Sequence, residues 1–369
     1  MSRLPQEASR RPGGRQVMAV IFCSVVGRSF ITVPPLLIRE AGYSAPLAAA
    51  MGLPFALLYL HLVMRLARRF PEQSVIQYLP RLAGKWGGRT LGLVFILFLV
   101  LFPAFGIRYM GEVTSVYFLE LTPQAVTGLL FLLVVGALAY LGLEDAARFA
   151  QGTFLFVLSL LVPLVLFSAN NFRWSFIRPV FPLEWSSFPG PAFIAAEHLM
   201  NAGSLLLLFF PYFTHREVIA GQAVKGVLLA GMATIWIVLG TLATFGPATT
   251  GHFLVPSVEF VRAIRLPISL VEQPSMVFGV LWIIVTINVI GIYLLAAAVA
   301  LKQWLGVKNY RPVLAALLPL VYVLSQLPLV PQGILALYAR AVYLWGVLVG
   351  FLPVLLLLLA VLRGQKDAS

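Results

Sequence analysis

The sequence predicts an all-α integral membrane protein with ten transmembrane helices, arranged as two inverted repeats of five spans with discontinuous first and sixth spans. Three observations support this prediction. The 369-residue chain is 60% hydrophobic and only 11% charged, whereas soluble domains are about 25% charged. Ten apolar runs have lengths close to or above the roughly 20 residues of a spanning helix. Polar, glycine-containing segments interrupt the first and sixth runs, which is typical of transporters with a binding site between two broken helices.

The expected spans cover most of the chain, which we interpret as a single transmembrane domain over 1–369. The apolar runs are 17–37, 46–64, 90–118, 124–143, 149–168, 192–212, 223–246, 272–301, 312–330 and 335–362. A tail, 1–16, precedes the first repeat, 17–168, and the second repeat is 192–362. Their topologies are inverted because five is an odd number of crossings. Short helices expected near 71–79 and 258–264, after the second and seventh spans, support this correspondence.

The distribution of positive charge follows membrane topology rather than nucleic-acid binding. The chain has 26 Lys and Arg against 13 Asp and Glu residues, a net charge of +13. The basic residues concentrate in the N-terminal tail, in the connection 65–89 and in every second connection thereafter. Positive residues accumulate on the cytoplasmic side of a membrane. Both termini are therefore expected in the cytoplasm, and the bilayer is the only partner that the basicity predicts, through weak attraction to anionic lipid.

The cysteine and histidine content indicates neither a disulfide framework nor a metal site. Cys23 is the only cysteine, and the four histidines are scattered along the chain. Motifs for phosphate loops, dinucleotide binding, zinc proteases and serine hydrolases are absent from the sequence. We therefore expect no cofactor and no catalytic residue, and a polytopic membrane enzyme is the least favoured function.

The interruptions at 27–29 and 201–204 are the candidate ligand site. Backbone N–H groups freed where a helix restarts are natural anion ligands, and the helix dipole strengthens them. A small molecule is expected to bind there, near the bilayer midplane, with the third and eighth spans as side walls. The residues expected to present backbone groups are Gly27, Ser29, Asn201 and Gly203.

Arg28 places a permanent charge inside the first span, at an insertion cost of roughly 2.5–3.5 kcal/mol. Three interpretations stay open. The guanidinium binds a ligand carboxylate, pairs with an intramembrane acid, or faces a water-filled vestibule. We expect its charge to be compensated inside the protein by Glu112, by helix-end carbonyls or by a bound carboxylate.

The third span contains a charged pair and an aromatic stripe. Arg108 and Glu112 lie four residues apart, on one helix face. They form either a self-compensating ion pair near the outer end of the span, or a gate or proton relay in which Glu112 titrates. Phe102 and Phe105 belong to a stripe at helical spacing and are candidate lining residues.

Polar residues in the sixth and eighth spans complete the candidates. Asn288 is an amide within the eighth apolar run, and it needs a hydrogen-bonding partner on another helix or in a ligand. Glu197 and His198 stand at the start of the sixth run and are expected at the membrane interface.

Several segments together resemble the B subunits of spore germinant receptors. The resemblance covers nearly the whole chain, in order and with similar spacing. Its motifs are Gly27-Arg28-Ser29-Phe30-Ile31-Thr32-Val33-Pro34, Gln77-Tyr78-Leu79, Gly84-Lys85-Trp86-Gly87, Arg108-x-Met110-x-Glu112, Leu121-Thr122-Pro123, Asp145-Ala146-Ala147-Arg148, Arg178-Pro179-Val180 and Leu281-Trp282-Ile283-Ile284.

The resemblance implies a LeuT-like fold of the amino acid–polyamine–organocation superfamily. It further implies a subunit in the inner membrane of a bacterial spore that senses a small nutrient, typically an amino acid, together with A-type and C-type receptor subunits. In relatives a small residue and then a glycine commonly follow the first glycine, whereas this chain has Arg28 and Ser29. That difference puts an alanine-type specificity in question. A proton-coupled amino-acid permease that transports its ligand is the alternative function.

Overall fold

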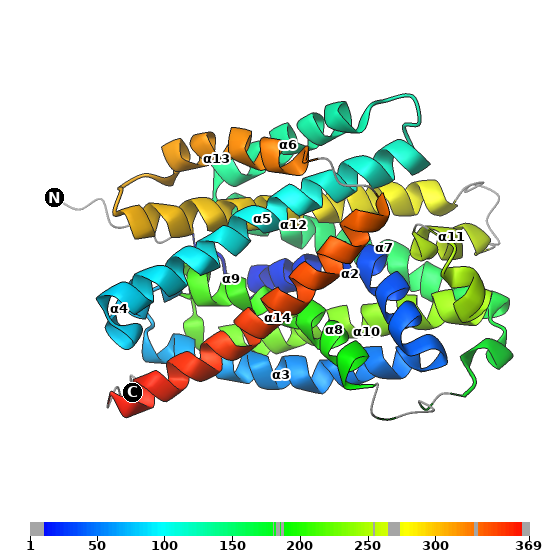
Figure 1. Ribbon diagram of the computed structural model, residues 1–369, viewed down its shortest axis with the longest axis horizontal. Coiled ribbons are helices and arrows are strands. Elements are labelled where there is room, and N and C mark those ends of the chain that lie inside the picture. Colours follow the sequence, from blue (N-terminus) through cyan, green and yellow to red (C-terminus); the bar gives the residue numbers. More distant parts are fainter. Residues whose placement is uncertain are drawn as a thin grey trace.

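The computed structural model describes residues 11–179, 181, 185, 188–253, 255–264, 274–327 and 331–363, and Figure 1 shows their arrangement. The described residues form helices and contain no β-strand. The α-helices are α2 (Gly14–Ala41), α3 (Ala45–Arg69), α4 (Val75–Ala83), α5 (Lys85–Tyr117), α6 (Gln124–Leu141), α7 (Leu143–Ser168), α8 (Pro189–Met200), α9 (Ala202–Phe209), α10 (Arg216–Thr250), α11 (Pro256–Ala263), α12 (Pro274–Leu305), α13 (Tyr310–Ser325) and α14 (Pro331–Leu362).

These helices confirm the all-α membrane class. Among the described residues, 8 helical stretches are long and apolar enough to cross a bilayer, and one of them, Gly14–Arg69, contains both α2 and α3. A shorter apolar helix, Tyr310–Ser325, lies where the ninth span was expected. Each expected run therefore coincides with a helix, whereas the exact number of crossings and the repeat boundaries stay predictions.

The two short helices expected between spans are present as α4 and α11. A capping box sets the start of α4, because the Ser74 N–H donates to the Gln77 side chain at 2.9 Å and such reciprocal bonds satisfy the free N–H groups of a first turn. Just before α4, Arg216 at the start of α10 donates to Glu72, and this hydrogen bond lowers the pKa of Glu72. The connection between α3 and α4 is thus tied to α10.

The prediction that the first span is discontinuous at Gly27 is wrong, because α2 is one continuous helix. The stretch is nonetheless weakened. The Thr32 hydroxyl is 2.9 Å from the Arg28 carbonyl one turn earlier, a contact that often bends helices. Pro34 and Pro35 lie inside the helix and lack the N–H groups that would bond the carbonyls four residues before them. The sequence signal therefore marked a loosened turn rather than a break.

The sixth span is interrupted only locally where the sequence predicts a discontinuity, because Asn201 keeps right-handed helical backbone angles (φ −56°, ψ −37°). α8 ends at Met200 and α9 begins at Ala202, with Asn201 between them. The Asn201 carbonyl accepts hydrogen bonds from the Ser204 N–H at 3.1 Å and the Ser204 hydroxyl at 2.7 Å. Both donors belong to the third residue ahead, which is the spacing of a 3₁₀ turn rather than of an α-helix. A third donor, the Tyr293 hydroxyl of α12, reaches the same carbonyl at 2.9 Å.

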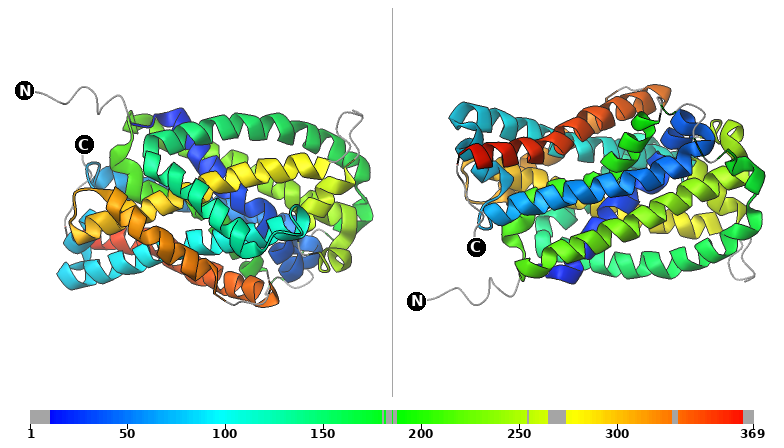
Figure 2. Two further views of the ribbon diagram at one scale, coloured as in Figure 1. Left: turned by 90° about the horizontal axis from the view of Figure 1, so that it is seen from above. Right: turned by 90° about the horizontal axis from the view of Figure 1, so that it is seen from below.

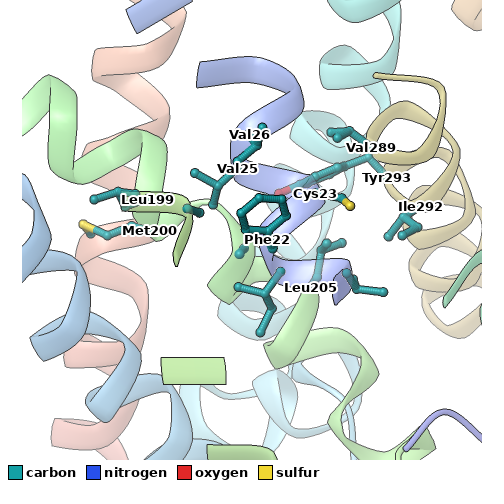
Figure 3. Packing of buried hydrophobic residues seen from close by; sticks show 14 of the residues in the cluster. Phe22, Cys23, Val25, Val26, Leu199, Met200, Leu205, Val289, Ile292 and Tyr293 are labelled. Atoms are coloured by element: carbon teal, nitrogen blue, oxygen red, sulfur yellow. The ribbon is translucent and has the colours of Figure 1, made fainter. Parts of the chain in front are cut away.

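α2 runs obliquely through the middle of the bundle (Figure 2) and packs against α7, α8, α10 and α12. Its side chains are buried along almost its whole length. Figure 3 shows Phe22, Val25 and Val26 of α2 beside Leu199 of α8 and Tyr293 of α12. The two helices next to the predicted interruptions, α2 and α8, therefore meet α12 in the core.

The outer helices expose large apolar side chains, as lipid contact requires. Examples are Leu130 of α6, Leu155 and Leu166 of α7, Val323 of α13 and Leu358 of α14, each at least half exposed. Apolar surface of this extent is not stable against water. Together with the long apolar helices, it makes the chain an integral membrane protein.

Candidate functional site

A cavity of about 110 Å³ lies between α2, α5, α8, α12 and α14. Four of the residues predicted to bind ligand line it: Gly27, Arg28, Phe102 and Phe105. The remaining lining is largely aromatic and aliphatic, and comes from Ile31, Thr32, Phe98, Leu101, Gly106, Tyr109, Glu197, Trp282, Thr286, Val289, Ile290 and Trp345. An apolar cavity with a few convergent polar groups is the typical form of a small-molecule site.

Arg28 pairs with Glu197 across this cavity wall. Its Nη2 lies 3.0 Å from Oε2 and 3.2 Å from Oε1 of Glu197, and both side chains are almost fully buried. Arg28 therefore has an intramembrane acid as its partner, which was one of the three interpretations. The expectation that Glu112 supplies that acid, and the expectation that Glu197 lies at the interface, are both wrong.

Glu197 was misplaced because the sixth apolar run was read from residue 192, whereas α8 already begins at Pro189. Glu197 consequently lies in the third turn of α8, one turn before Asn201, where α8 ends. A spacing of four residues places Glu197 and Asn201 on one helix face. That spacing, next to a predicted break, was the signal in the sequence that identifies Glu197 as part of the site.

His198 extends the cluster from α8 to α2. The imidazole is fully buried, with Nδ1 2.9 Å from the Ile194 carbonyl and 3.1 Å from Glu197 Oε2. Its Nε2 lies 3.1 Å from the Thr32 hydroxyl. The interfacial position expected for His198 is therefore also wrong, and both of its ring nitrogens are engaged in the core.

Asn201 contributes through its side chain as well as its backbone. With the amide oxygen toward Arg28, it accepts from Nη1 at 2.7 Å and from Nη2 at 3.1 Å, and the amide nitrogen then donates to the Tyr293 hydroxyl at 2.7 Å. This orientation follows from the hydrogen-bonding partners, which decide an amide's orientation. Asn201 thus supports the Arg28 guanidinium behind the cavity wall, although it does not line the cavity itself.

The Gly27 carbonyl is held by α12. The Trp282 indole nitrogen donates to it at 3.1 Å and the Thr286 hydroxyl at 3.3 Å. Only glycine allows this approach, because a Cβ at position 27 would lie 2.7 Å from Val289 Cγ2 and 2.9 Å from Val285 Cγ1. At Gly27, α2 therefore packs closely against α12, the eighth expected span, and the Gly27 carbonyl is bound by that helix.

Aromatic rings form the wall contributed by α5. The Arg28 guanidinium lies 5.7 Å from the centre of the Phe102 ring, within the range of a cation–π interaction. Phe102 also contacts Tyr293, with ring centres 4.1 Å apart. The predicted walls from the third and eighth spans thus correspond to α5 and α12.

Three predicted residues lie near the site without lining the cavity. Ser29 is fully buried. Gly203 packs against Tyr59 of α3, whose Cε1 would be 2.4 Å from an added Cβ. The Asn288 amide donates to the Ala146 carbonyl of α7 at 3.1 Å, which is the interhelical bond that was one of its two interpretations. Their part in ligand binding stays a prediction.

Arg108 and Glu112 lie one turn apart on α5, half-buried, and their charges interact. Neither belongs to the cavity lining. A self-compensating pair and a gating pair both remain consistent with this position. Among the described residues, no group of three His, Cys, Asp or Glu side chains is arranged to hold a metal ion.

Comparison with known protein families gives a match over most of the chain. Residues 14–333 match a family described as spore germination protein. Spore germination protein YndE of Bacillus subtilis (strain 168) is 25% identical over 313 residues, covering 83% of this chain and 84% of that protein. Spore germination protein B2 of the same organism is 23% identical over 273 residues, covering 72% of each chain.

Two solved structures, one of them of a transporter, have a similar fold. MhsT in complex with L-phenylalanine superposes with a TM-score of 0.65 at 14% identity, covering 94% of this chain and 97% of that chain. Mhp1, a nucleobase-cation-symport-1 family transporter with bromovinylhydantoin bound, gives a TM-score of 0.60 at 15% identity, covering 93% of this chain and 79% of that chain. The fold is thus LeuT-like, as expected.

Proposed function

Because the chain belongs to the spore germination protein family, we propose that it is a permease-like subunit that senses a small nutrient and triggers germination. The nutrient binds in the cavity beside Arg28. One observation carries this proposal most directly: an apolar cavity ends at a buried Arg28–Glu197 pair in a transporter fold. A permanent pair of opposite charges in such a place is a functional site by default.

The chemistry of the cavity favours an amino acid with an apolar side chain. The aromatic and aliphatic lining accommodates the side chain. The carboxylate of the ligand competes with Glu197 for the Arg28 guanidinium, and the ammonium group pairs with Glu197. Arg28 thereby replaces part of the backbone anion site that was expected at the first span, and it leaves less space than a small residue would.

Ligand binding shifts a conformational equilibrium. The two residues of the ion pair belong to α2 and α8, and each of these elements is weakened next to its charged residue. A ligand that separates Arg28 from Glu197 changes the relative stability of two arrangements of α2 and α8. Such a ligand shifts the equilibrium only by its differential affinity for the two arrangements.

The sensor would work in the spore inner membrane, with both termini in the cytoplasm. Its partners would be A-type and C-type receptor subunits, which read the conformational shift. The family membership and the length of the apolar helices support this assignment. The positive charges of the tail and the alternating connections support the orientation.

A second candidate function is a proton-coupled amino-acid permease. The LeuT-like fold, shared with MhsT and with the transporter Mhp1, favours it. The presence of an ionisable histidine in the buried cluster also favours it. The two candidates share the cavity and differ only in whether the ligand crosses the membrane.

We expect at least one of the twenty proteinogenic L-amino acids to raise the melting temperature of the purified chain, because a ligand that binds only the folded state stabilises it by mass action. The measurement is a thermal-shift panel in detergent. If none of the twenty has an effect, an amino acid is not the ligand and this proposal fails.

We further expect the amino acid that binds to show no concentrative uptake into proteoliposomes that contain the chain alone, with a proton gradient imposed across the membrane. Protein-free liposomes control for leakage. Concentrative uptake driven by the gradient would contradict the sensor and establish the permease.

A further inference from the structure

We propose that His198 is a proton-binding site whose occupancy controls a hydrogen bond on the Arg28 peptide of α2. His198 is the only buried residue among the four histidines, since His61, His215 and His252 are exposed. Its neighbours restrict the hydrogen positions so strongly that its two protonation states require different hydrogen bonds. Five groups determine this geometry: Ile194, Glu197, His198, Thr32 and Arg28.

The Nδ1 atom carries a proton in both states. It faces two acceptors, the Ile194 carbonyl at 2.9 Å and Glu197 Oε2 at 3.1 Å. A bare ring nitrogen is an acceptor, and three acceptors facing one another in a buried site would be strongly unfavourable. Neutral His198 is therefore the Nδ1–H tautomer, with a bare Nε2.

The Thr32 hydroxyl has one proton and two acceptors within reach. One is His198 Nε2 at 3.1 Å and the other is the Arg28 carbonyl at 2.9 Å. When His198 is neutral, the hydroxyl donates to Nε2. When His198 binds a proton, Nε2–H donates to the Thr32 oxygen, and the hydroxyl donates to the Arg28 carbonyl. Protonation thus forms a continuous chain of hydrogen bonds from α8 to the peptide of Arg28.

The charged groups next to His198 influence how readily it binds a proton. Among the described side chains, the charged groups that act on His198 are Arg28 from α2 and Glu197 on its own helix. α3 packs against α8 as well, and its Tyr59 contacts Gly203 in the next element. α14 contributes Gly346, which packs on Glu197. The cluster has no net charge with neutral His198 and one positive charge after protonation.

The positive charge that His198 gains on protonation couples proton binding to ligand binding. This step alone rests on the proposed function. A carboxylate in the cavity beside Arg28 offsets a positive charge on His198. Proton and carboxylate would then bind with positive coupling, and the coupling is reciprocal. The proton site itself does not depend on whether an amino acid binds.

The test is ¹⁵N NMR of histidine-labelled protein in nanodiscs, without added ligand. Replacing the three exposed histidines (His61→Gln, His215→Gln, His252→Gln) leaves His198 as the sole signal. We expect Nδ1 to be protonated and Nε2 bare at about pH 9, and both nitrogens to become protonated as the pH falls to about 4, at lower pH than for an exposed histidine, because burial and the Arg28 charge oppose a second positive charge. Thr32→Val should perturb the Nε2 resonance and leave that of Nδ1 nearly unchanged.

Two results would overturn the proposal. One is a neutral ring with its proton on Nε2, and the other is a spectrum of His198 that stays the same over this whole pH range. Because the experiment contains no amino acid, a failure here is distinct from a failure of the thermal-shift panel.

Discussion

Glu197→Ala should destabilise the protein by ~3–5 kcal/mol, because it leaves the Arg28 guanidinium buried without its acid. Arg28 and Glu197 are 3.0 Å apart and nearly inaccessible to water. Arg28→Met should have a cost of the same order, since it strands the carboxylate instead. Both effects are measured as changes in the midpoint of unfolding in detergent.

The stability of the double variant Arg28→Met/Glu197→Leu separates the effect of the ion pair from the effect of side-chain packing. Removing both charges avoids a stranded ion, so the double variant should be more stable than either single variant. Arg262→Ala is the matched control, because Arg262 pairs with Glu259 on an exposed face of α11 and exposed pairs contribute about 0–1 kcal/mol. A Glu197→Ala protein as stable as the Arg262→Ala protein would mean that the Arg28–Glu197 pair is not desolvated.

Gly52→Ala should be the most damaging conservative substitution in α3. A Cβ at this position would lie 2.7 Å from the Ala196 nitrogen and 2.8 Å from the Ala195 carbonyl carbon of α8. These atoms belong to the backbone and cannot rotate away, so α3 and α8 must separate. Overpacking typically costs about 1–3 kcal/mol and occasionally more, and we expect the upper end here because the clash is with a backbone.

Gly152→Ala in α7 is the control for this substitution. The space around Gly152 is open to 4 Å, and alanine is the better helix former by about 1 kcal/mol. This variant should therefore be as stable as the wild type or slightly more stable. Thermal unfolding of the two variants side by side tests the account of the α3–α8 contact, and equal melting temperatures would refute it.

The sequence was sufficient to predict the membrane class, the helical segments and four of the five helices that line the cavity, namely α2, α5, α8 and α12. Apolar runs predict spans reliably because the bilayer imposes a minimum length on them. The segment at 201–204 predicted the local interruption at Asn201, between the end of α8 and the start of α9. The segment at 27–29 predicted a break that α2 does not have. The Gly27 carbonyl in this continuous helix accepts hydrogen bonds from Trp282 and Thr286 of α12.

The partner of Arg28 was the main error in the candidate site. Glu112 was favoured because it lies within an apolar run, and Glu197 was set aside because it lies near the start of one. Helix ends are uncertain by a few residues when read from hydrophobicity alone. Three additional residues at the start of α8 place Glu197 in the core. The contact itself joins residues 169 positions apart, and no local pattern in the sequence specifies such a pairing.

The central claim is that a small nutrient binds in the cavity beside Arg28, and a cavity-filling variant tests it most directly. Leu101 of α5 lines the cavity, whose volume is about 110 Å³, so the indole of Leu101→Trp should occupy much of it. Leu97→Trp is the matched control, because Leu97 lies one turn earlier on α5, is 55% exposed and does not line the cavity.

The measurement is equilibrium binding of the amino acid that the thermal-shift panel identifies, in wild type and in both variants. We predict that Leu101→Trp loses at least tenfold in affinity, equivalent to about 1.4 kcal/mol, while Leu97→Trp binds as the wild type does and both variants stay folded. Unchanged affinity in a folded Leu101→Trp protein would contradict the account and place the ligand elsewhere.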